Sequence, residues 1–254
     1  MKTVTLPESF QAWRTAARQL LQQEVSPAQV LWSNHSELGL DFDKQNDLPS
    51  DFTGTPQAYR VPKHFLNLAE SVSCHRNPIK WEILYRMLWK LTHEEPRLLQ
   101  IGLDPDLIEC KRMIRAIRRD CHKMKAFVRF REITVAQGDA HHKACFVAWF
   151  EPEHFIVPRI APFFKQRFAN MHWSILTPDI CAHWDEHQLW FTVGVDRTMA
   201  PRTDNFEQLW LTYYTNIFNP ARLKPKAMRA EMPKKYWKNL PEASLIQSLV
   251  RQSV

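Results

Sequence analysis

Two groups of carboxylates and histidines have the residue types that acid–base chemistry requires. They are Glu151, Glu153 and His154, which follow the run FVAWF, and further along the chain Asp179, His183 and Asp185. A carboxylate beside a histidine could transfer protons, and two carboxylates with a histidine could hold a divalent metal. Neither spacing matches a defined catalytic motif, so whether the chain is an enzyme stays open. The catalytic candidates are Glu151, His154, His183 and Asp185.

Basic residues are concentrated in two segments of the chain. Residues 111–131 hold nine Lys and Arg against one acid, Asp120, a net charge of +8 in a chain whose whole formal charge is +7. Residues 222–238 carry a further net charge of +6, so the remainder is net acidic. An acidic body with two cationic segments indicates an anionic polymer as partner. The DNA-binding candidates are Lys111, Arg115, Arg118, Arg119, Lys123, Lys125, Arg129, Arg131, Lys234 and Lys235.

Composition excludes several classes of site. The chain has only five Gly, no two of them close together, which excludes a P-loop, a dinucleotide-binding GxGxxG and the GxSxG turn of serine hydrolases. Its five Cys are scattered singly, which favours reduced thiols in the cytoplasm over disulfides or a zinc ribbon. No apolar run is long enough to span a membrane, and the N-terminus lacks the apolar core of a signal peptide. The sequence assigns no metal-ligating residue and no cofactor, and it leaves metal dependence open.

The hydrophobic pattern predicts the elements that position these residues. Apolar residues at helical spacing predict helices over 7–24, 64–75, 81–93, 157–171 and 205–218. A long helix begins at Asp104-Pro105-Asp106, and its apolar residues advance by three or four up to Met124, which leaves Arg115, Arg118 and Arg119 on another face. After Lys125 the period changes to two. The segments 126–135 and 143–151 therefore predict a β-hairpin with Arg129 and Arg131 on one strand face, and short strands are predicted over 173–179, 181–185 and 189–193.

These elements predict an α+β protein, an antiparallel ββαββ sheet core with surrounding helices. We expect a single domain over residues 1–254, helical over 1–125, sheet-containing over 126–195, and helical and basic over 204–254. Aromatic and basic residues alternate at 127–131, 165–168 and 234–238. This interleaving suits single-stranded or flipped-base DNA, whose phosphates and bases must both be held.

Several long sequence words resemble a known family. They include HKMKAFVRFRE (122–132), FVAWFEPEHFIV (146–157) and YYTNIFNPARLKPKAMRAEMPKKYWKNLPEA (213–243). These words are similar to a bacterial family of unknown biochemical function whose members are described as DNA metabolism or DNA repair proteins. Members occur fused to uracil-DNA-glycosylase-like domains or encoded beside a radical-SAM protein, and this chain resembles the stand-alone form. The resemblance implies a context of DNA damage or modification, and it assigns no catalytic residue.

Three hypotheses about function follow. The first is a DNA-binding protein of repair or DNA metabolism that acts with a glycosylase-like or radical-SAM partner. The second is a DNA-processing enzyme, a glycosylase or hydrolase that uses the carboxylate and histidine candidates. The third is a scaffold whose basic surface docks an acidic protein. Under all three the chain is expected in the cytoplasm with no membrane partner.

Overall fold

The computed structural model describes residues 1–34, 59–133, 145–199 and Tyr236. The chain divides into two compact units, Met1–Arg118 and Arg119–Val254. The boundary falls inside one long helix, α4, which spans Pro105–Phe127. Compactness does not show that either unit folds alone, so the expectation of a single domain stays a prediction. No helix in the part of the chain that the structure describes is long and apolar enough to cross a membrane.

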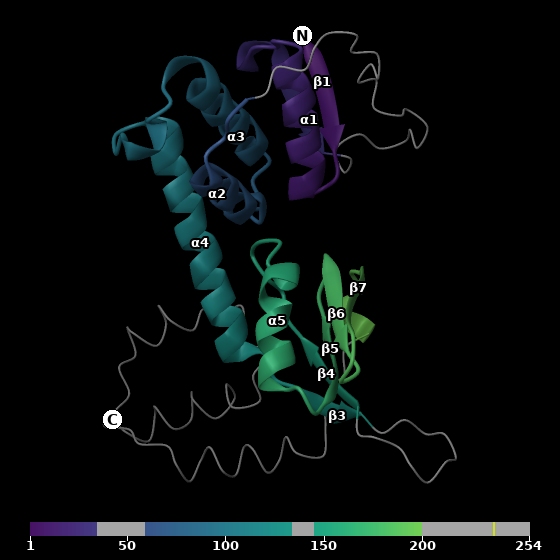
Figure 1. Cartoon of the computed structure of the whole chain (residues 1–254). Helices are drawn as coiled ribbons and strands as arrows, with labels where there is room; N and C mark the ends of the chain where they lie inside the picture. The colour runs from purple at the N-terminus through teal and green to yellow at the C-terminus, as the bar shows by residue number, and fades with distance from the viewer. Residues whose placement is uncertain (35–58, 134–144, 200–235, 237–254) are drawn as a thin grey trace, which may run out of the picture. The chain divides into compact units, whose positions relative to one another are not determined.

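The elements of the first unit are β1 (Lys2–Leu6), α1 (Phe10–Gln22), β2 (Val30–Asn34), α2 (Lys63–Ser73) and α3 (Ile79–Trp89). In this unit, α1, α2 and α3 lie beside the first half of α4 (Figure 1). These helices pack around a core rich in aromatic side chains. Ser9 begins α1 by accepting a hydrogen bond from the backbone N–H of Ala12 at 3.4 Å. The strands β1 and β2 pair in parallel across α1. The sequence pattern did not predict this pair.

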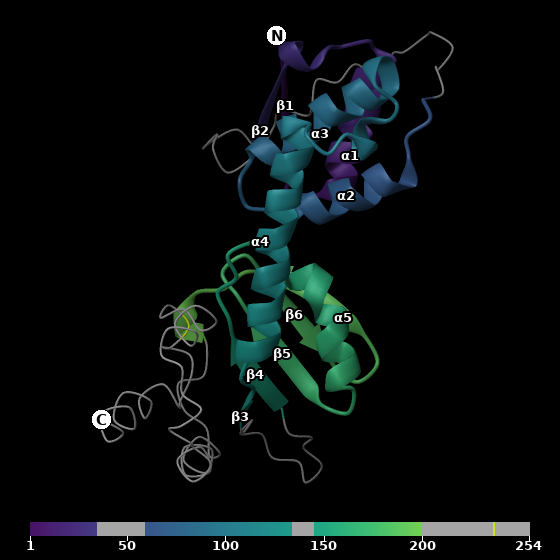
Figure 2. The same ribbon diagram turned by 90° about the vertical axis from the view of Figure 1, so that its left-hand side faces the viewer.

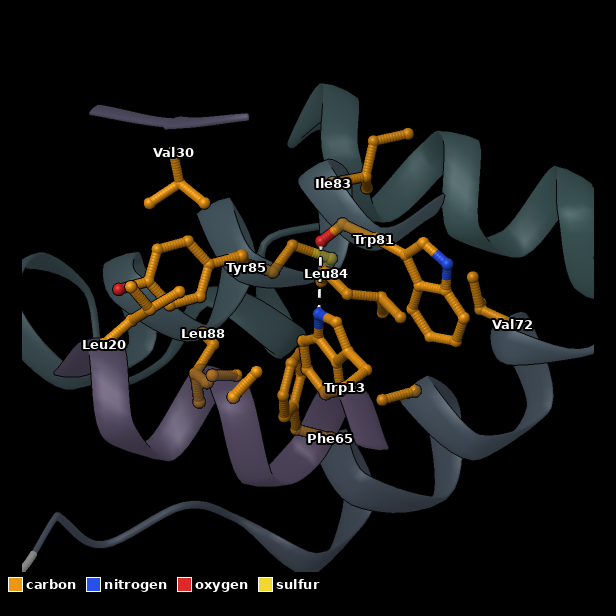
Figure 3. Close-up of a cluster of buried hydrophobic side chains, with 14 of the residues drawn as sticks. Trp13, Leu20, Val30, Phe65, Val72, Trp81, Ile83, Leu84, Tyr85 and Leu88 are labelled. Carbon is orange, nitrogen blue, oxygen red and sulfur yellow. Dashed lines mark hydrogen bonds between the residues drawn. The ribbon is translucent and has the colours of Figure 1, made fainter. Parts of the chain in front are cut away.

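Trp13 of α1 and Trp81 of α3 lie at the centre of this core (Figure 3). The indole Nε1 of Trp13 donates to the backbone oxygen of Trp81 at 3.3 Å, and the two rings stack at 6.1 Å. Tyr85 also donates its buried hydroxyl, at 2.7 Å, to the backbone oxygen of Val25. Because these two polar atoms have partners, Trp13 and Tyr85 are buried without leaving their donors unsatisfied. The buried indole Nε1 of Trp81, in contrast, has no hydrogen-bond partner among the described residues.

The second unit contains a five-stranded sheet. Its elements are β3 (Arg131–Ile133), β4 (Cys145–Trp149), α5 (Val157–Arg167), β5 (His172–Leu176), β6 (Ile180–Trp184) and β7 (Leu189–Val193). The strands lie in the order β3-β4-β5-β6-β7. A quarter turn of the view shows α5 and the last turns of α4 on the same side of this sheet (Figure 2). Alternate residues of β5, Trp173 and Ile175, are buried on the helix-covered face, which leaves Ser174 on the other face.

The α+β class is confirmed, but the prediction of a purely antiparallel sheet is wrong. The strands β4 and β5 pair in parallel, whereas the other three pairs are antiparallel. The physical reason is the connection: α5 carries the chain back along the sheet before β5 begins, so β5 runs in the same direction as β4. The predicted hairpin of the first two strands is confirmed, although α4 continues to Phe127 and its first strand begins only at Arg131. The predicted helix over 205–218 lies outside the described residues.

Candidate nucleic-acid interface

The helix α4 is held at its start by a network of opposite charges. Asp104 accepts a hydrogen bond from the backbone N–H of Leu107 at 2.9 Å, which caps the first turn. Lys90 Nζ lies 3.0 Å from a carboxylate oxygen of Asp104 and 3.0 Å from one of Asp106, and an Arg86 nitrogen lies 2.7 Å from Asp106. Burial alone would raise the pKa of Asp106, but hydrogen bonds from Arg86 and Lys90 outweigh it and lower that pKa. Asp106 therefore stays ionised, and the contacts of both acids tie the start of α4 to the end of α3.

One stripe of α4 carries exposed basic side chains. Its members follow one another at spacings of four, three, four and three residues, which repeats a single face of an α-helix. They are Lys111, Arg115, Arg118, His122 and Lys125, and all five are exposed. Arg119 is exposed beside this stripe, and exposed Arg112 lies on its flank, where its Nε is 3.3 Å from Glu109. We call these seven residues the α4 cationic face. Because the unit boundary falls after Arg118, each unit carries its own part of this face.

The single acid among the last eighteen residues of α4 does not share the α4 cationic face. Asp120 is only 1% exposed. Its Oδ2 accepts the backbone N–H of His154 at 2.9 Å, and its Oδ1 accepts the hydroxyl of Tyr236 at 3.3 Å. A buried carboxylate is tolerated when such donors satisfy it. The exposed side of α4 after Glu109 thus presents cations with no carboxylate from the helix between them.

Tyr236 completes this buried site from the far end of the chain. Its ring stacks on Phe150 at 5.0 Å and on Phe127 at 5.7 Å. Burial, with the nearby charge of Asp120, raises the pKa of Tyr236, so the phenol stays protonated and remains a donor. The run FVAWFEPEH is therefore anchored to α4 through Asp120, a contact that sequence spacing could not reveal.

Three of the predicted DNA-binding residues have a different setting. Arg129 is not on a strand: its guanidinium donates to the backbone oxygens of Ala126 at 2.7 Å and of Val128 at 3.2 Å, at the end of α4. Such a cation satisfies carbonyls at the negative end of the helix. Lys123 is mostly buried, and its Nζ lies 4.0 Å from Glu153. Arg131 is half-buried on β3. Lys234 and Lys235 lie outside the described residues.

The catalytic candidates at the end of β4 are held by structural contacts. Glu151 accepts the indole N–H of Trp149 at 2.8 Å, while Arg197 lies over the same indole ring at 5.3 Å. His154 is buried, and its backbone N–H is the donor to Asp120. These contacts position the segment, and they do not define a reaction.

The structure gives His183 and Asp185 separate partners. Asp185 lies in the turn between β6 and β7, where its Oδ1 accepts backbone N–H groups of His187 at 2.9 Å and Gln188 at 2.6 Å. These bonds lower the pKa of Asp185 and hold the tight turn. In the residues that the structure describes, no three His, Cys, Asp or Glu side chains gather in a way that could hold a metal ion.

His183 lies on the sheet face opposite α5, where two hydroxyls hold its ring. Ser174 Oγ is 2.8 Å from Nδ1 and Thr192 Oγ1 is 2.9 Å from Nε2. Burial lowers the pKa of His183 and favours the neutral imidazole. A serine beside a histidine resembles a nucleophile and its base, but the second partner here is a hydroxyl, which cannot stabilise an imidazolium as a carboxylate would.

Strand register aligns one row of side chains across this open sheet face. In chain order they are Arg131, Val147, Ser174, His183 and Trp190. Trp190 is 39% exposed and its ring stacks on His183 at 5.4 Å. Sequence reasoning missed Ser174, Thr192 and Trp190, because alternation within a strand shows which residues share a face but not which residues stand opposite in the next strand.

Comparison with known proteins identifies a family but no characterised relative. A family model described as "Domain of unknown function (DUF4130)" matches residues 78–242, more than half of the chain. The match includes α3, α4, the five-stranded sheet and Tyr236. No curated protein and no solved structure matches the chain.

Proposed function

The chain belongs to the DUF4130 family, and we propose that it binds DNA through the α4 cationic face and works in DNA repair or DNA metabolism. The resemblance of its long sequence words to DNA repair proteins supplies the context, and the surface chemistry of α4 supports an anionic partner. On the same resemblance we infer a glycosylase-like or radical-SAM protein as the partner that would carry out chemistry on the DNA.

One observation carries this proposal: the exposed cations of α4 share their face with no carboxylate of the helix beyond Glu109. A helix that only needs to be soluble usually mixes both signs of charge, since pairs spaced by three or four residues then stabilise it. The only acid of α4 beyond Glu109 is Asp120, which is turned inward and satisfied by His154 and Tyr236. Phosphates along a nucleic-acid strand complement such a row of cations, of which only Arg112, at the flank, lies near a carboxylate of the helix.

The test measures DNA affinity as a function of salt for the full chain. Fluorescence anisotropy with single-stranded, duplex and lesion-containing oligonucleotides should show affinity that falls steeply as salt rises, because each neutralised phosphate releases counterions. The double variant Arg115→Glu/Arg119→Glu should abolish binding to all three, since charge reversal replaces attraction with repulsion. Comparing the three substrates also shows which form of DNA is preferred.

A matched control is the double variant Arg60→Glu/Arg97→Glu. It makes the same change in net charge at two exposed arginines outside α4, so it should bind DNA with nearly the affinity of the wild-type chain. If the two double variants lose affinity equally, only overall charge matters and the α4 cationic face is not the site. If the wild-type chain binds none of the oligonucleotides even at low salt, the proposal is wrong, and docking of an acidic protein becomes the better hypothesis.

A further inference from the structure

The first unit contains a cavity of about 480 Å³ between α1 and α2. Pockets that hold small molecules usually measure about 300–1,000 Å³ and are largely apolar. The cavity lies before the family match except for one lining residue, Leu88 of α3. It is also remote in sequence from the α4 cationic face, so what it binds is a question independent of DNA binding.

The floor of the cavity is apolar and preformed. It is lined by Trp13, Ala17 and Leu21 of α1, with Phe65 of α2 and Leu88 of α3, all of which are buried. Trp13 is fixed by its hydrogen bond to the backbone of α3, and Phe65 lies beside it in the core (Figure 3). Ala17 stands in the middle of the α1 wall, where its small side chain leaves the space open. A floor of this kind would leave the polar edges of a sugar or nucleobase without partners.

The rim of the cavity carries two cations. Arg14 and Arg18 lie one turn apart on α1 and are exposed, and both line the cavity. Within residues 1–34, 59–133 and 145–199, neither guanidinium forms an ion pair with a described acid. Two guanidinium groups at the mouth of an apolar cavity complement a single carboxylate, sulfonate or phosphate group.

Tyr59 closes one side of the cavity in a fixed position. Its hydroxyl contacts a carboxylate oxygen of Glu24 in a short hydrogen bond and lies 3.4 Å from the backbone oxygen of Leu21. Burial, helped by the hydrogen bond to Glu24, raises the pKa of Tyr59 to about 12. The phenol therefore stays neutral, and its O–H continues to donate to Glu24 and to hold the ring in place. The ring of His93, which stacks on Trp89 at 3.9 Å, supports Tyr59 at 5.4 Å.

We propose that this cavity binds a small amphiphile, an apolar body of roughly a drug-sized ligand that ends in one anionic group. The body occupies the floor formed by Trp13, Ala17 and Phe65, and the anionic group meets Arg14 and Arg18 at the rim. The apolar floor gives affinity for hydrocarbon, and the arginine pair selects an anion over the corresponding alcohol.

The test uses 8-anilinonaphthalene-1-sulfonate, an aromatic sulfonate whose fluorescence rises in apolar surroundings, as the probe for the full chain. We expect saturable binding of one probe per chain, displaced by decanoate and much less effectively by decan-1-ol. In Arg14→Gln/Arg18→Gln, decanoate affinity should fall about tenfold or more, as expected for the loss of a charge-assisted contact. The affinity for decan-1-ol should not change.

Two further variants complete the experiment. Ala17→Leu fills the cavity and should abolish binding of the probe itself. Arg97→Gln, which changes an exposed arginine outside the cavity, should bind the probe and both competitors like the wild-type chain. Far-ultraviolet circular dichroism identifies any variant that does not fold, and the arginine pair, being exposed, tests the proposal even if Ala17→Leu unfolds. Unchanged decanoate affinity in Arg14→Gln/Arg18→Gln would overturn the proposal. So would probe binding that never saturates in the wild-type chain.

Discussion

Neutralising two pairs of basic residues on or next to α4 should give opposite results, because the structure gives the two pairs different roles. Arg115 and Arg118 are exposed on the α4 cationic face. Arg129 donates to the backbone oxygens at the end of the helix, and Lys123 is mostly buried near Glu153. Arg115→Gln/Arg118→Gln and Lys123→Gln/Arg129→Gln each remove two positive charges, so net charge does not distinguish them. Because the two pairs lie in different environments, the first variant should weaken DNA binding and the second should mainly lower stability.

The expected size of each effect follows from these contacts. Each phosphate neutralised on duplex DNA contributes about −0.9 to the slope of log affinity against log salt, so losing Arg115 and Arg118 should make the slope about 1.8 shallower. Between 50 and 200 mM salt this corresponds to roughly a twelvefold smaller loss of affinity. A cation that binds the carbonyls at a helix end stabilises by about 1–2 kcal/mol when partly buried. The ion pair between Lys123 and Glu153 contributes little further stability, because Glu153 is exposed to solvent and the two charged groups are 4.0 Å apart. The second variant should therefore unfold about 2–8 °C lower.

Fluorescence anisotropy at four salt concentrations measures the slopes, and thermal unfolding followed by circular dichroism measures stability. The assignment of different roles to the two pairs is refuted if Lys123→Gln/Arg129→Gln reduces the salt slope as much as Arg115→Gln/Arg118→Gln does. It is equally refuted if the exposed pair can be neutralised with no change in slope.

Three other predictions concern buried ionisable groups. Lys80 is fully buried, its Nζ lies 2.5 Å from Glu8 and 2.5 Å from the backbone oxygen of His75, and burial lowers its pKa. Glu8→Gln should therefore lower stability by about 1–3 kcal/mol, because it removes the negative charge that compensates for the burial of the ammonium group. Lys80→Met should cost less, because the Glu8 carboxylate is partly in water, and urea unfolding that shows the reverse order would contradict this account. Burial also lowers the pKa of His183 in the folded chain below the value of about 6.5 that a histidine has in the unfolded chain. As the pH falls, this histidine is therefore protonated at a higher pH in the unfolded chain than in the folded chain. Stability should then fall as the pH drops below that value. In urea titrations, His183→Gln should lose less stability between pH 7.5 and pH 5 than the wild-type chain does. Equal losses in the two proteins would count against the assignment. Burial raises the pKa of Tyr59, Tyr85 and Tyr236. At most two of the five tyrosines should thus ionise in the folded chain soon after a jump to pH 11, and ultraviolet absorbance that reports four or five would be inconsistent with these buried phenols.

Local pattern predicted the elements that depend on neighbouring residues. The stripe that ends at Met124 and the Asp104-Pro105-Asp106 start predicted α4, and the change to a period of two predicted the hairpin of β3 and β4. The exposure of Arg115, Arg118 and Arg119 also follows from helical period alone. The parallel pairing of β1 with β2 and of β4 with β5 was not predicted, because it depends on where a crossover helix returns the chain rather than on any local pattern.

The same distinction applies to the candidate sites. Residue types identified Glu151, His154, His183 and Asp185 as possible catalysts. In the structure Glu151 contacts the nearby Trp149, His154 and His183 contact Asp120 and Ser174, and Asp185 accepts backbone N–H groups of its own turn. The apolar cavity of the first unit had no signal in the sequence, because Trp13, Phe65 and Leu88 come together only when three helices pack.

The sequence by itself therefore determined the family, the α+β class and a concentrated positive charge with helical period, all of which depend on residue identity and short spacing. The tertiary structure decided which cations are available. It turned Asp120 inward, placed Arg129 on the end of α4 and brought Lys123 near Glu153, while Arg115 and Arg118 stayed exposed. The physical reason is that burial and hydrogen-bond partners decide what an ionic group can do. For Asp120 and Lys123 these partners come from distant segments that only the fold brings together, and even the local contacts of Arg129 depend on where α4 ends.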